Sequence, residues 1–334
     1  MNYTCRHLSG FILDQNVMQF IPEFADVEKA YELIRRYIHN TPVMTSESIN
    51  KITGSTVFFK CENFQKAGAF KFRGACNAVF NLAVSGADIK KGVATHSSGN
   101  HAAALALAAK IKGISANIVM PVSSPEIKKR AVAGYGAVIT FCEPTLDSRE
   151  STLAKVIAQT GATEVHPYNN FYVIAGQGTA ALELIEEAGE FDIVMAPVGG
   201  GGLISGTAIT VKKLLPGCRV VAAEPAGADD AFRSFHSGKL LPSVNPKTIA
   251  DGLLTSLGTR TFAVIQDKVD DIVTVSEEII VEAMRLIWER MKIIIEPSSA
   301  VPLAAILEKK VDVHNKRVGI ILSGGNLDLG KLPF

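Results

Sequence analysis

The segment AGAFKFRGA (67–75) places Lys71 between Phe70 and Phe72. An apolar setting disfavours a charged ammonium and lowers the pKa of a lysine. The neutral amine is the form that condenses with a carbonyl to give a Schiff base. Lys71 is therefore a candidate for covalent attachment of an aldehyde. The alternative, from spacing alone, is a surface lysine near the start of a helix.

Two further segments join a predicted strand to a predicted helix through small residues. THSSGNHA (95–102) presents backbone N–H groups at a helix N-terminus, either to bind phosphate or carboxylate or as an ordinary N-cap. The glycine run of VGGGGLISG (198–206) lets the backbone approach a phosphate closely. Gly200, Gly202 and Glu224 partly match a dinucleotide fingerprint, so an NAD-dependent oxidoreductase stays an alternative. Ser205 at the final glycine position counts against it.

Two more strand ends carry polar residues. Ser323 ends a predicted strand in ILSGGN (321–326), and ligands gather at the carboxyl ends of strands in open α/β sheets. Glu224 and Asp230 flank a glycine turn in AEPAGADDA (223–231). Carboxylates combined with backbone carbonyls suit Mg²⁺ or Ca²⁺. The alternative for this pair is a solvated acidic loop.

The elements that must position these residues alternate along the chain, which predicts an α/β fold with parallel strands. We predict helices over 25–40, 100–112, 125–136, 147–160, 175–188, 203–215 and 277–291. We predict strands over 56–62, 92–98, 115–121, 137–143, 192–198, 219–225, 270–276 and 317–323. A chain of 334 residues is long for one core. We expect a small mobile domain over 93–168 and a large cofactor-binding domain from 1–92 with 169–334.

The composition argues against some classes of binding partner. A net charge of +1 argues against nucleic acid or an anionic membrane as the main partner. No stretch approaches the ~18 consecutive apolar residues of a membrane helix. The five cysteines include no CxxC pair, which is typical of a reduced, cytoplasmic protein. The first residues do not resemble a secretory signal, and we expect a mobile extension before the first helix.

Taken in order, these segments resemble the fold-type II pyridoxal-phosphate (PLP) enzymes of the serine racemase and serine/threonine dehydratase family. The resemblance covers 24–330 and is carried by FADVEKA, FFKCENFQK, FKFRGA, THSSGNHA, YGA, AGQGT, VGGGG, AAEP, TIADG, WERMK, IEP and LSGGN. It implies a two-domain architecture like the tryptophan synthase β-subunit and a homodimer. It also implies interconversion of L- and D-serine with β-elimination to pyruvate and ammonia. The alternative is a serine/threonine dehydratase or threo-3-hydroxyaspartate ammonia-lyase without significant racemisation.

The resemblance also implies roles for individual residues. Lys71 would form the Schiff base and act as the base on one substrate face, and Ser98 would act on the other. Ser323 would face the pyridine nitrogen and leave it largely unprotonated. The remaining cofactor contacts would be Phe70, Asn100, Gly199, Gly200, Gly201 and Gly202. The substrate carboxylate would lie against Ser97, Ser98, Gly99, Asn100 and His101, with Arg149 able to meet a distal carboxylate.

Two effector sites follow from the same resemblance. Mg²⁺, or Ca²⁺ or Mn²⁺ in its place, would bind Glu224, the Ala228 carbonyl and Asp230. ATP would bind as an allosteric effector at Glu28, Ser46, Lys66, Tyr135, Lys292 and Asn326. Ala67 and Ala103 replace polar residues of that site, so we expect ATP activation to be weakened. The chain departs from its relatives again at Ala69 and Tyr168.

Overall fold

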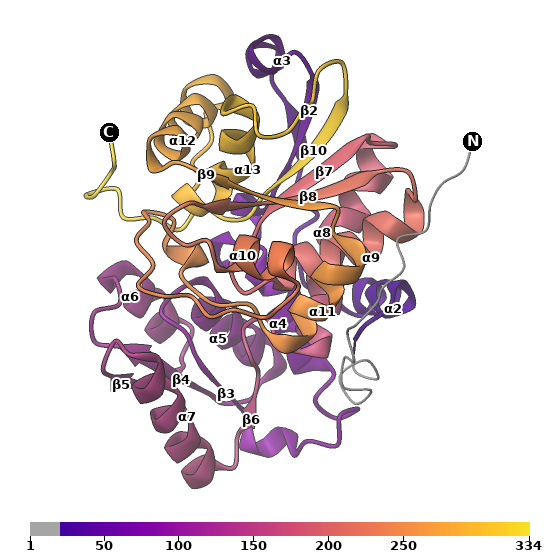
Figure 1. The fold of residues 1–334 in the computed structure, drawn as a ribbon. Helices are drawn as coiled ribbons and strands as arrows, with labels where there is room; N and C mark the ends of the chain where they lie inside the picture. Colours follow the sequence, from indigo (N-terminus) through magenta and orange to yellow (C-terminus); the bar gives the residue numbers. More distant parts are fainter. Residues whose placement is uncertain (1–20) are drawn as a thin grey trace.

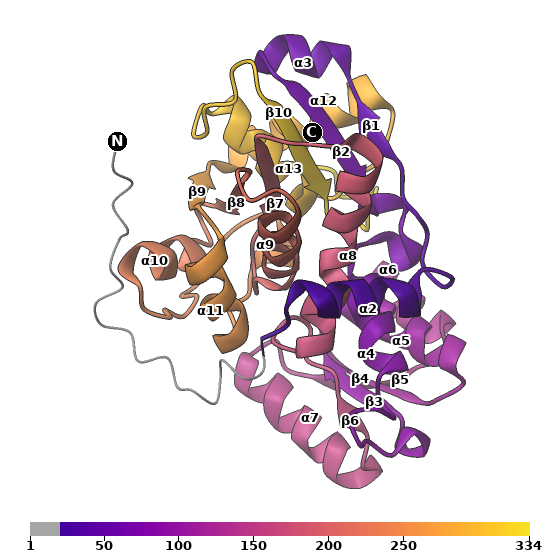
Figure 2. The ribbon, with the colours of Figure 1, turned by 90° about the vertical axis from the view of Figure 1, so that its right-hand side faces the viewer.

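A computed structural model describes residues 21–334, and the predicted N-terminal extension lies almost entirely outside them. The strands form two sheets (Figures 1 and 2). One has six strands in the order β1-β2-β10-β7-β8-β9, and the other has four in the order β5-β4-β3-β6. Every neighbouring pair is parallel except β1 and β2. The predicted α/β class is confirmed.

The larger sheet is buried on both faces, as expected for a parallel sheet covered by helices. Its strands are β1 (Val43–Thr45), β2 (Thr56–Cys61), β7 (Ile193–Pro197), β8 (Arg219–Pro225), β9 (Asp271–Val275) and β10 (Arg317–Leu322). Side chains alternate between its faces. Met195 and Val221 pack into one core cluster, with α12 (Glu277–Met291) and α13 (Pro297–Leu307). Val194 and Val220 pack into another, with α8 (Phe171–Ala188) and α9 (Gly202–Leu214).

The smaller sheet lies at the opposite end of the molecule (Figure 1). It contains β3 (Val93–His96), β4 (Ala116–Pro121), β5 (Val138–Cys142) and β6 (Thr163–Glu164). Helices α5 (Asn100–Lys112), α6 (Glu126–Gly134) and α7 (Leu146–Thr160) connect these strands. All of these elements fall inside the range 93–168. Division of the chain into two domains that move relative to each other stays a prediction.

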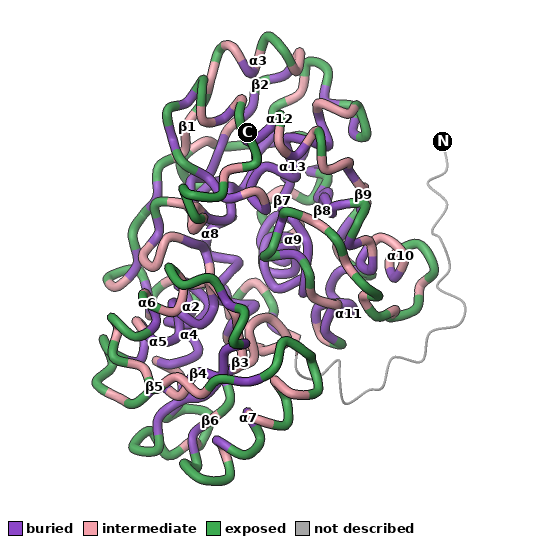
Figure 3. Tube along the Cα trace, turned by 90° about the vertical axis from the view of Figure 1, so that its left-hand side faces the viewer, coloured by how far each residue is buried: buried purple, intermediate pink, exposed green. Residues whose placement is uncertain are grey.

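A layer of closely packed helices joins the two sheets. Helix α4 (Lys71–Phe80) packs against α5 and α8, and α8 packs against α9 and α2 (Phe24–Ile34). The helices approach closely because glycines face each other: a Cβ on Gly176 would lie 2.7 Å from the Gly74 Cα, and one on Gly206 would lie 2.5 Å from the Gly178 N. Figure 3 shows this central part of the trace as mostly buried, with exposed stretches around the outside.

The agreement between predicted and observed element bounds varies along the chain. The predicted helices 100–112 and 277–291 and the strand 219–225 have the observed bounds. The helix predicted over 25–40 ends at Ile34, and the helix predicted over 175–188 begins earlier, at Phe171. The prediction missed α3 (Glu47–Thr53), α4, α10 (Asp230–Ser237), α11 (Thr259–Lys268), α13, β1 and β6. Pro302 obscured α13, since proline is unfavourable inside helices, whereas Pro297 is at the first position, where proline is tolerated.

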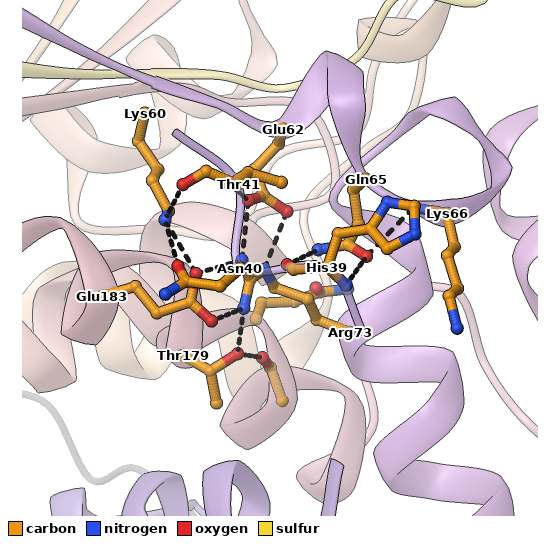
Figure 4. Close-up of polar contacts among 12 residues, drawn as sticks. His39, Asn40, Thr41, Lys60, Glu62, Gln65, Lys66, Arg73, Thr179 and Glu183 are labelled. Carbon is orange, nitrogen blue, oxygen red and sulfur yellow. Dashed lines mark hydrogen bonds and ion pairs between the residues drawn. The ribbon is translucent and has the colours of Figure 1, made fainter. Parts of the chain in front are cut away.

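A buried network of four charges holds α4 in place (Figure 4). Arg73, two residues after Lys71, is fully buried and binds Glu62 and Glu183 with its guanidinium, at distances of 2.6 to 2.8 Å. Lys60 Nζ, on β2, lies 2.7 Å from the Glu183 carboxylate. Two cations therefore balance two anions. Burial alone would raise the pKa of Glu62, but the Arg73 guanidinium holds it below the usual value.

We expect Arg73→Met to destabilise the fold strongly, because it leaves two buried carboxylates with only Lys60 as a cation. Breaking a buried ion pair costs about 3–5 kcal/mol. Urea denaturation followed by circular dichroism measures the loss. Arg35→Met is the matched control, since the Arg35–Glu32 pair is exposed and its loss is worth about 0–1 kcal/mol. Equal midpoints for the two variants would contradict the assigned role.

Candidate functional site

Lys71 is the first residue of α4, and its side chain is partly buried. Its Nζ donates a hydrogen bond to the Pro167 carbonyl at 3.0 Å. The rings of Phe70 and Tyr168 lie 5.1 and 5.9 Å from Nζ. Burial lowers the pKa of Lys71 to about 8, against the opposing charge of Glu296. The surface-lysine alternative is therefore wrong, although the lysine does begin a helix.

The glycine run forms the turn between β7 and α9 and offers a row of free amides. None of the backbone N–H groups from Gly199 to Ile204 donates to another group in the described part of the chain. Gly201 has a φ of +86°, which favours glycine. Side chains at these positions would also collide with their neighbours, because the Tyr168 ring lies against Gly200 and Leu253 against Gly199. Free amides at a helix N-terminus fit a phosphate.

A second turn of the same kind precedes α5. The Ser97 amide donates to the Val119 carbonyl, and the Gly99 amide to the Ser97 hydroxyl. The amides of Ser98, Asn100, His101 and Ala102 have no acceptor within residues 21–334. No side chain caps the helix at Gly99, so the ordinary N-cap interpretation is wrong. This turn could bind a carboxylate.

The Asn100 side chain belongs to a polar chain that connects the two sheets. Its Nδ2 donates to both oxygens of Glu296, at 2.8 and 3.1 Å. Asn326 Nδ2 donates to the Asn100 Oδ1 at 3.0 Å and to the Ala67 carbonyl at 2.7 Å. Burial raises the pKa of Glu296 to about 7. Sequence reasoning noticed the IEP segment but gave Glu296 no role, and a charged residue next to Pro297 was the only signal.

Ser323 lies at the carboxyl end of β10, next to Phe70, the residue before Lys71. Its carbonyl accepts a 3.0 Å hydrogen bond from the Phe70 amide. Its hydroxyl lies 3.0 Å from that of Ser299, which also accepts from the Gly324 amide. The structure therefore brings Phe70, Lys71 and Ser323 together. Ser299, on α13, was missed because that helix was missed.

Arg149 lies near the turn that precedes α5. Burial and the neighbouring Arg149 charge lower the pKa of His96, the residue before Ser97. The Arg149 Nε atom is buried and has no hydrogen-bond partner in the described chain. Burial also lowers the pKa of His101 and of His166 to about 3, so both rings are neutral at physiological pH. Arg149 and Lys71 are thus among the cationic groups on this side of the site.

The predicted cation ligands come together, but not in a solvated loop. Glu224 and Asp230 are both fully buried, so that alternative is wrong. Glu224 accepts hydrogen bonds from the amides of Ala231 and Phe232. Neither oxygen of Asp230 has a partner among the described residues. Burial raises the pKa of Glu224 to about 9 and that of Asp230 to about 6.

These two carboxylates and the buried Ala228 make a donor set that a hard cation would fit, because a cation offsets the cost of burying ionised carboxylates. Within residues 21–334, no group of three or more His, Cys, Asp or Glu side chains is arranged to hold a metal ion. The candidate site therefore depends on a backbone carbonyl as well as on the two carboxylates.

The residues predicted for ATP do not all meet within one copy of the chain. Asn326 binds the carbonyl of Ala67, the residue after Lys66. Glu28 lies on α2, and Ser46 precedes α3, far from α2 in both ribbon views (Figures 1 and 2). Tyr135 ends α6, and Lys292 ends α12 with a φ of +60°.

Two mostly parallel sheets with free-amide turns around a partly buried lysine define an α/β protein suited to hold a phosphorylated aldehyde. Residues 34–324 match the family described as "Pyridoxal-phosphate dependent enzyme". The chain belongs to this family of PLP enzymes, and its fold is the fold-type II architecture. The glycine run therefore serves a PLP enzyme rather than the NAD-dependent alternative. No helix in the described part of the chain is long and apolar enough to cross a membrane.

Over most of its length the chain is similar to a dehydratase and to serine racemases. It is 54% identical over 315 residues to the beta-hydroxyaspartate dehydratase of Paracoccus denitrificans, covering 94% of this chain and 99% of that protein. It is 50% identical to the serine racemase of Dictyostelium discoideum, over 92% and 95% of the two chains. The structure of maize serine racemase superimposes with a TM-score of 0.90 at 46% identity, over 93% and 95% of the chains.

The residues present fit PLP. The turn from Gly199 to Gly202 would hold its phosphate, and Lys71 its aldehyde carbon. When bound, the cofactor supplies an electron-withdrawing ring that stabilises negative charge on the substrate α-carbon. Ser323 would offer that ring a neutral hydroxyl rather than a carboxylate. The free amides around Ser98 would orient a substrate carboxylate.

We expect the apoprotein to take up PLP with a visible absorption band that borohydride fixes covalently, and Lys71→Ala to lose the fixation. Lys129→Ala, on α6, is the control and should retain it. Because the neutral amine reacts, the initial rate of uptake should rise with pH until about 8 and then level. A rate independent of pH between 6 and 9, or a fixed band in Lys71→Ala, would contradict the assignment.

Proposed function

We propose that this enzyme interconverts L- and D-serine and also converts serine to pyruvate and ammonia by β-elimination. The observation that carries the proposal is an enclosed lysine amine with a pKa near 8, in a site that includes the free-amide turn containing Ser98. Similarity to serine racemases over more than nine tenths of the chain supports it.

In this proposal the amides of the Ser98 turn hold the substrate carboxylate. Lys71 then removes the α-proton on one face. Return of a proton from Ser98 on the other face inverts the centre. Loss of the β-hydroxyl instead gives an unsaturated amine, which water converts to pyruvate and ammonia. The ratio of the two outcomes depends on which group delivers a proton first.

A second candidate is elimination of water from threo-3-hydroxyaspartate. The specific observation in its favour is the buried Arg149 Nε without a partner, beside the turn that contains Ser98. A guanidinium pairs readily with a carboxylate. The similarity to a beta-hydroxyaspartate dehydratase supports the same interpretation.

A panel of L-serine, D-serine, L-threonine and threo-3-hydroxyaspartate, assayed for both D-amino acid and keto acid, tests the proposal. We expect D-serine from L-serine in the native enzyme. Ser98→Ala should lose at least about 100-fold of racemisation, the typical contribution of one acid–base group, and lose less of elimination. Lys129→Ala should match the native enzyme.

Two outcomes of this panel would overturn the racemase proposal. One is rapid pyruvate release from L-serine with no D-serine at any time. The other is a Ser98→Ala variant that racemises at the native rate. Oxaloacetate formed faster from hydroxyaspartate than pyruvate from serine would favour the second candidate.

We also propose that Glu224, Asp230 and the Ala228 carbonyl bind Mg²⁺, Ca²⁺ or Mn²⁺. Two buried carboxylates, one of them without a hydrogen-bond partner among residues 21–334, support a divalent cation at this position. A bound cation stabilises the folded state by mass action.

Chelator treatment should lower the melting temperature of the enzyme, and added Mg²⁺ should restore it. Thermal unfolding with and without the chelator measures this. Asp230→Asn should respond weakly to either addition, whereas Asp147→Asn, an exposed change on α7, should respond like the native protein. A native melting temperature unaffected by both additions would contradict the site.

A homodimer, a cytoplasmic location and ATP as an effector stay predictions from the resemblance. Because Glu28 and Ser46 lie far apart within one copy, an ATP site containing both would need two copies of the chain.

A further inference from the structure

An ion pair joins the two sheets at the edge of the candidate site. Lys128 on α6 binds Asp251 in the short helix η4 (Asp251–Leu253), and its Nζ lies 2.5 Å from the carboxylate. The Lys128 side chain is only 10% exposed, whereas Asp251 is 46% exposed. The two residues are 123 positions apart, so the contact depends entirely on the arrangement of the two halves.

Lys128 also contacts the turn that precedes α5. A Cβ on Gly99 would lie 3.3 Å from both the Cδ and the Nζ of Lys128. The ammonium that pairs with Asp251 therefore lies beside the free amides of the Ser98 turn.

The other partner, Asp251, is tied to the glycine run. Leu253, in the same short helix, packs on Gly199, where a Cβ would lie 2.9 Å from the Leu253 Cα. The Gly252 amide donates to the Ser298 hydroxyl at 3.2 Å, which fixes the helix to α13. One ion pair thus connects the turn that would hold the substrate carboxylate with the turn that would hold the phosphate.

A third charged group, Glu296, lies close enough to this ion pair for both partners to affect its pKa. Burial raises the pKa of Glu296, Asp251 raises it further, and Lys128 opposes both. Glu296 is itself bound to Asn100 on α5. The ion pair and the Asn100–Glu296 contact therefore form two adjacent links between the sheets.

We propose that Lys128 is a positioning residue and that its ion pair with Asp251 latches the Ser98 turn against the glycine run. That the turn binds a substrate carboxylate rests on the proposed function, whereas the contact between the two turns does not. With the pair intact, the free amides are held where they bind the substrate. Without it, each substrate encounter must also order the turn.

The kinetic test uses Lys128→Met, Asp251→Asn and the double variant in the holoenzyme, with whichever hydroxy-amino acid of the panel is turned over. Each single variant should raise KM by roughly fivefold, the effect of about 1 kcal/mol, and change kcat by less than about twofold. The double variant should be no worse than either single variant, because both changes break one contact. Lys128→Arg should retain most of the native KM.

Lys129→Met is the matched control. It lies on the same helix, but its Nζ donates to the Val122 carbonyl and has no contact with Asp251. Its KM should remain native. Additive effects of Lys128→Met and Asp251→Asn, or a KM increase as large in Lys129→Met, would overturn the proposal.

Amide hydrogen exchange gives a second readout that does not depend on the substrate. Exchange of the hydrogen-bonded amides of Ser97, Gly99 and Ala103 should be faster in Lys128→Met and Asp251→Asn than in the native enzyme or Lys129→Met. Unchanged exchange there overturns the latch even if the proposed function holds. Faster exchange without turnover of any panel substrate would support the latch while refuting the proposed function.

Discussion

The buried pairing of Arg73 with Glu62 and Glu183 is the constraint on which the rest of the site depends. An isolated charge inside a protein is costly, so each of these groups specifies where its partners must be. Glu62 follows β2, and Glu183 lies on α8. Arg73 can satisfy both only if α4 crosses between the sheet and α8 at one angle. Lys71, two residues earlier on the same helix, is thereby carried to the sheet edge.

The position of α4 then determines the chemistry of the lysine. Burial lowers the pKa of the amine, and the charge of Glu296 opposes that shift. The same backbone contact that holds Phe70 against Ser323 brings β10 into the site. Stability and reactivity are therefore linked through a single short helix.

Much of the fold could be predicted from the sequence, because buried parallel strands and capped helices leave strong local patterns. The strand ends at Ser323, Gly199 and Ser97 were found in this way. The parts that could not be predicted depend on distant contacts. Arg73 and Lys60 resemble ordinary charged residues until β2, α4 and α8 meet. Asp251 and Lys128 likewise carry no local signal, and α13 was hidden by Pro302.

The alternatives that the structure corrected share a physical cause. Lys71, Glu224 and Asp230 are charged residue types, which are mostly exposed in proteins, so a local reading favours solvent for each. Tyr168, far from Lys71 in the chain, lies beside the lysine, and the two carboxylates are buried in the core around β8, the strand that carries Glu224. Around Arg73, paired charges offset the cost of burial. Where no paired charge does so, a buried ionisable group has a shifted pKa and is a candidate to bind a ligand. In our proposals Lys71 binds the cofactor's aldehyde and the two carboxylates bind a cation, so function concentrates where charge balance within the chain is incomplete.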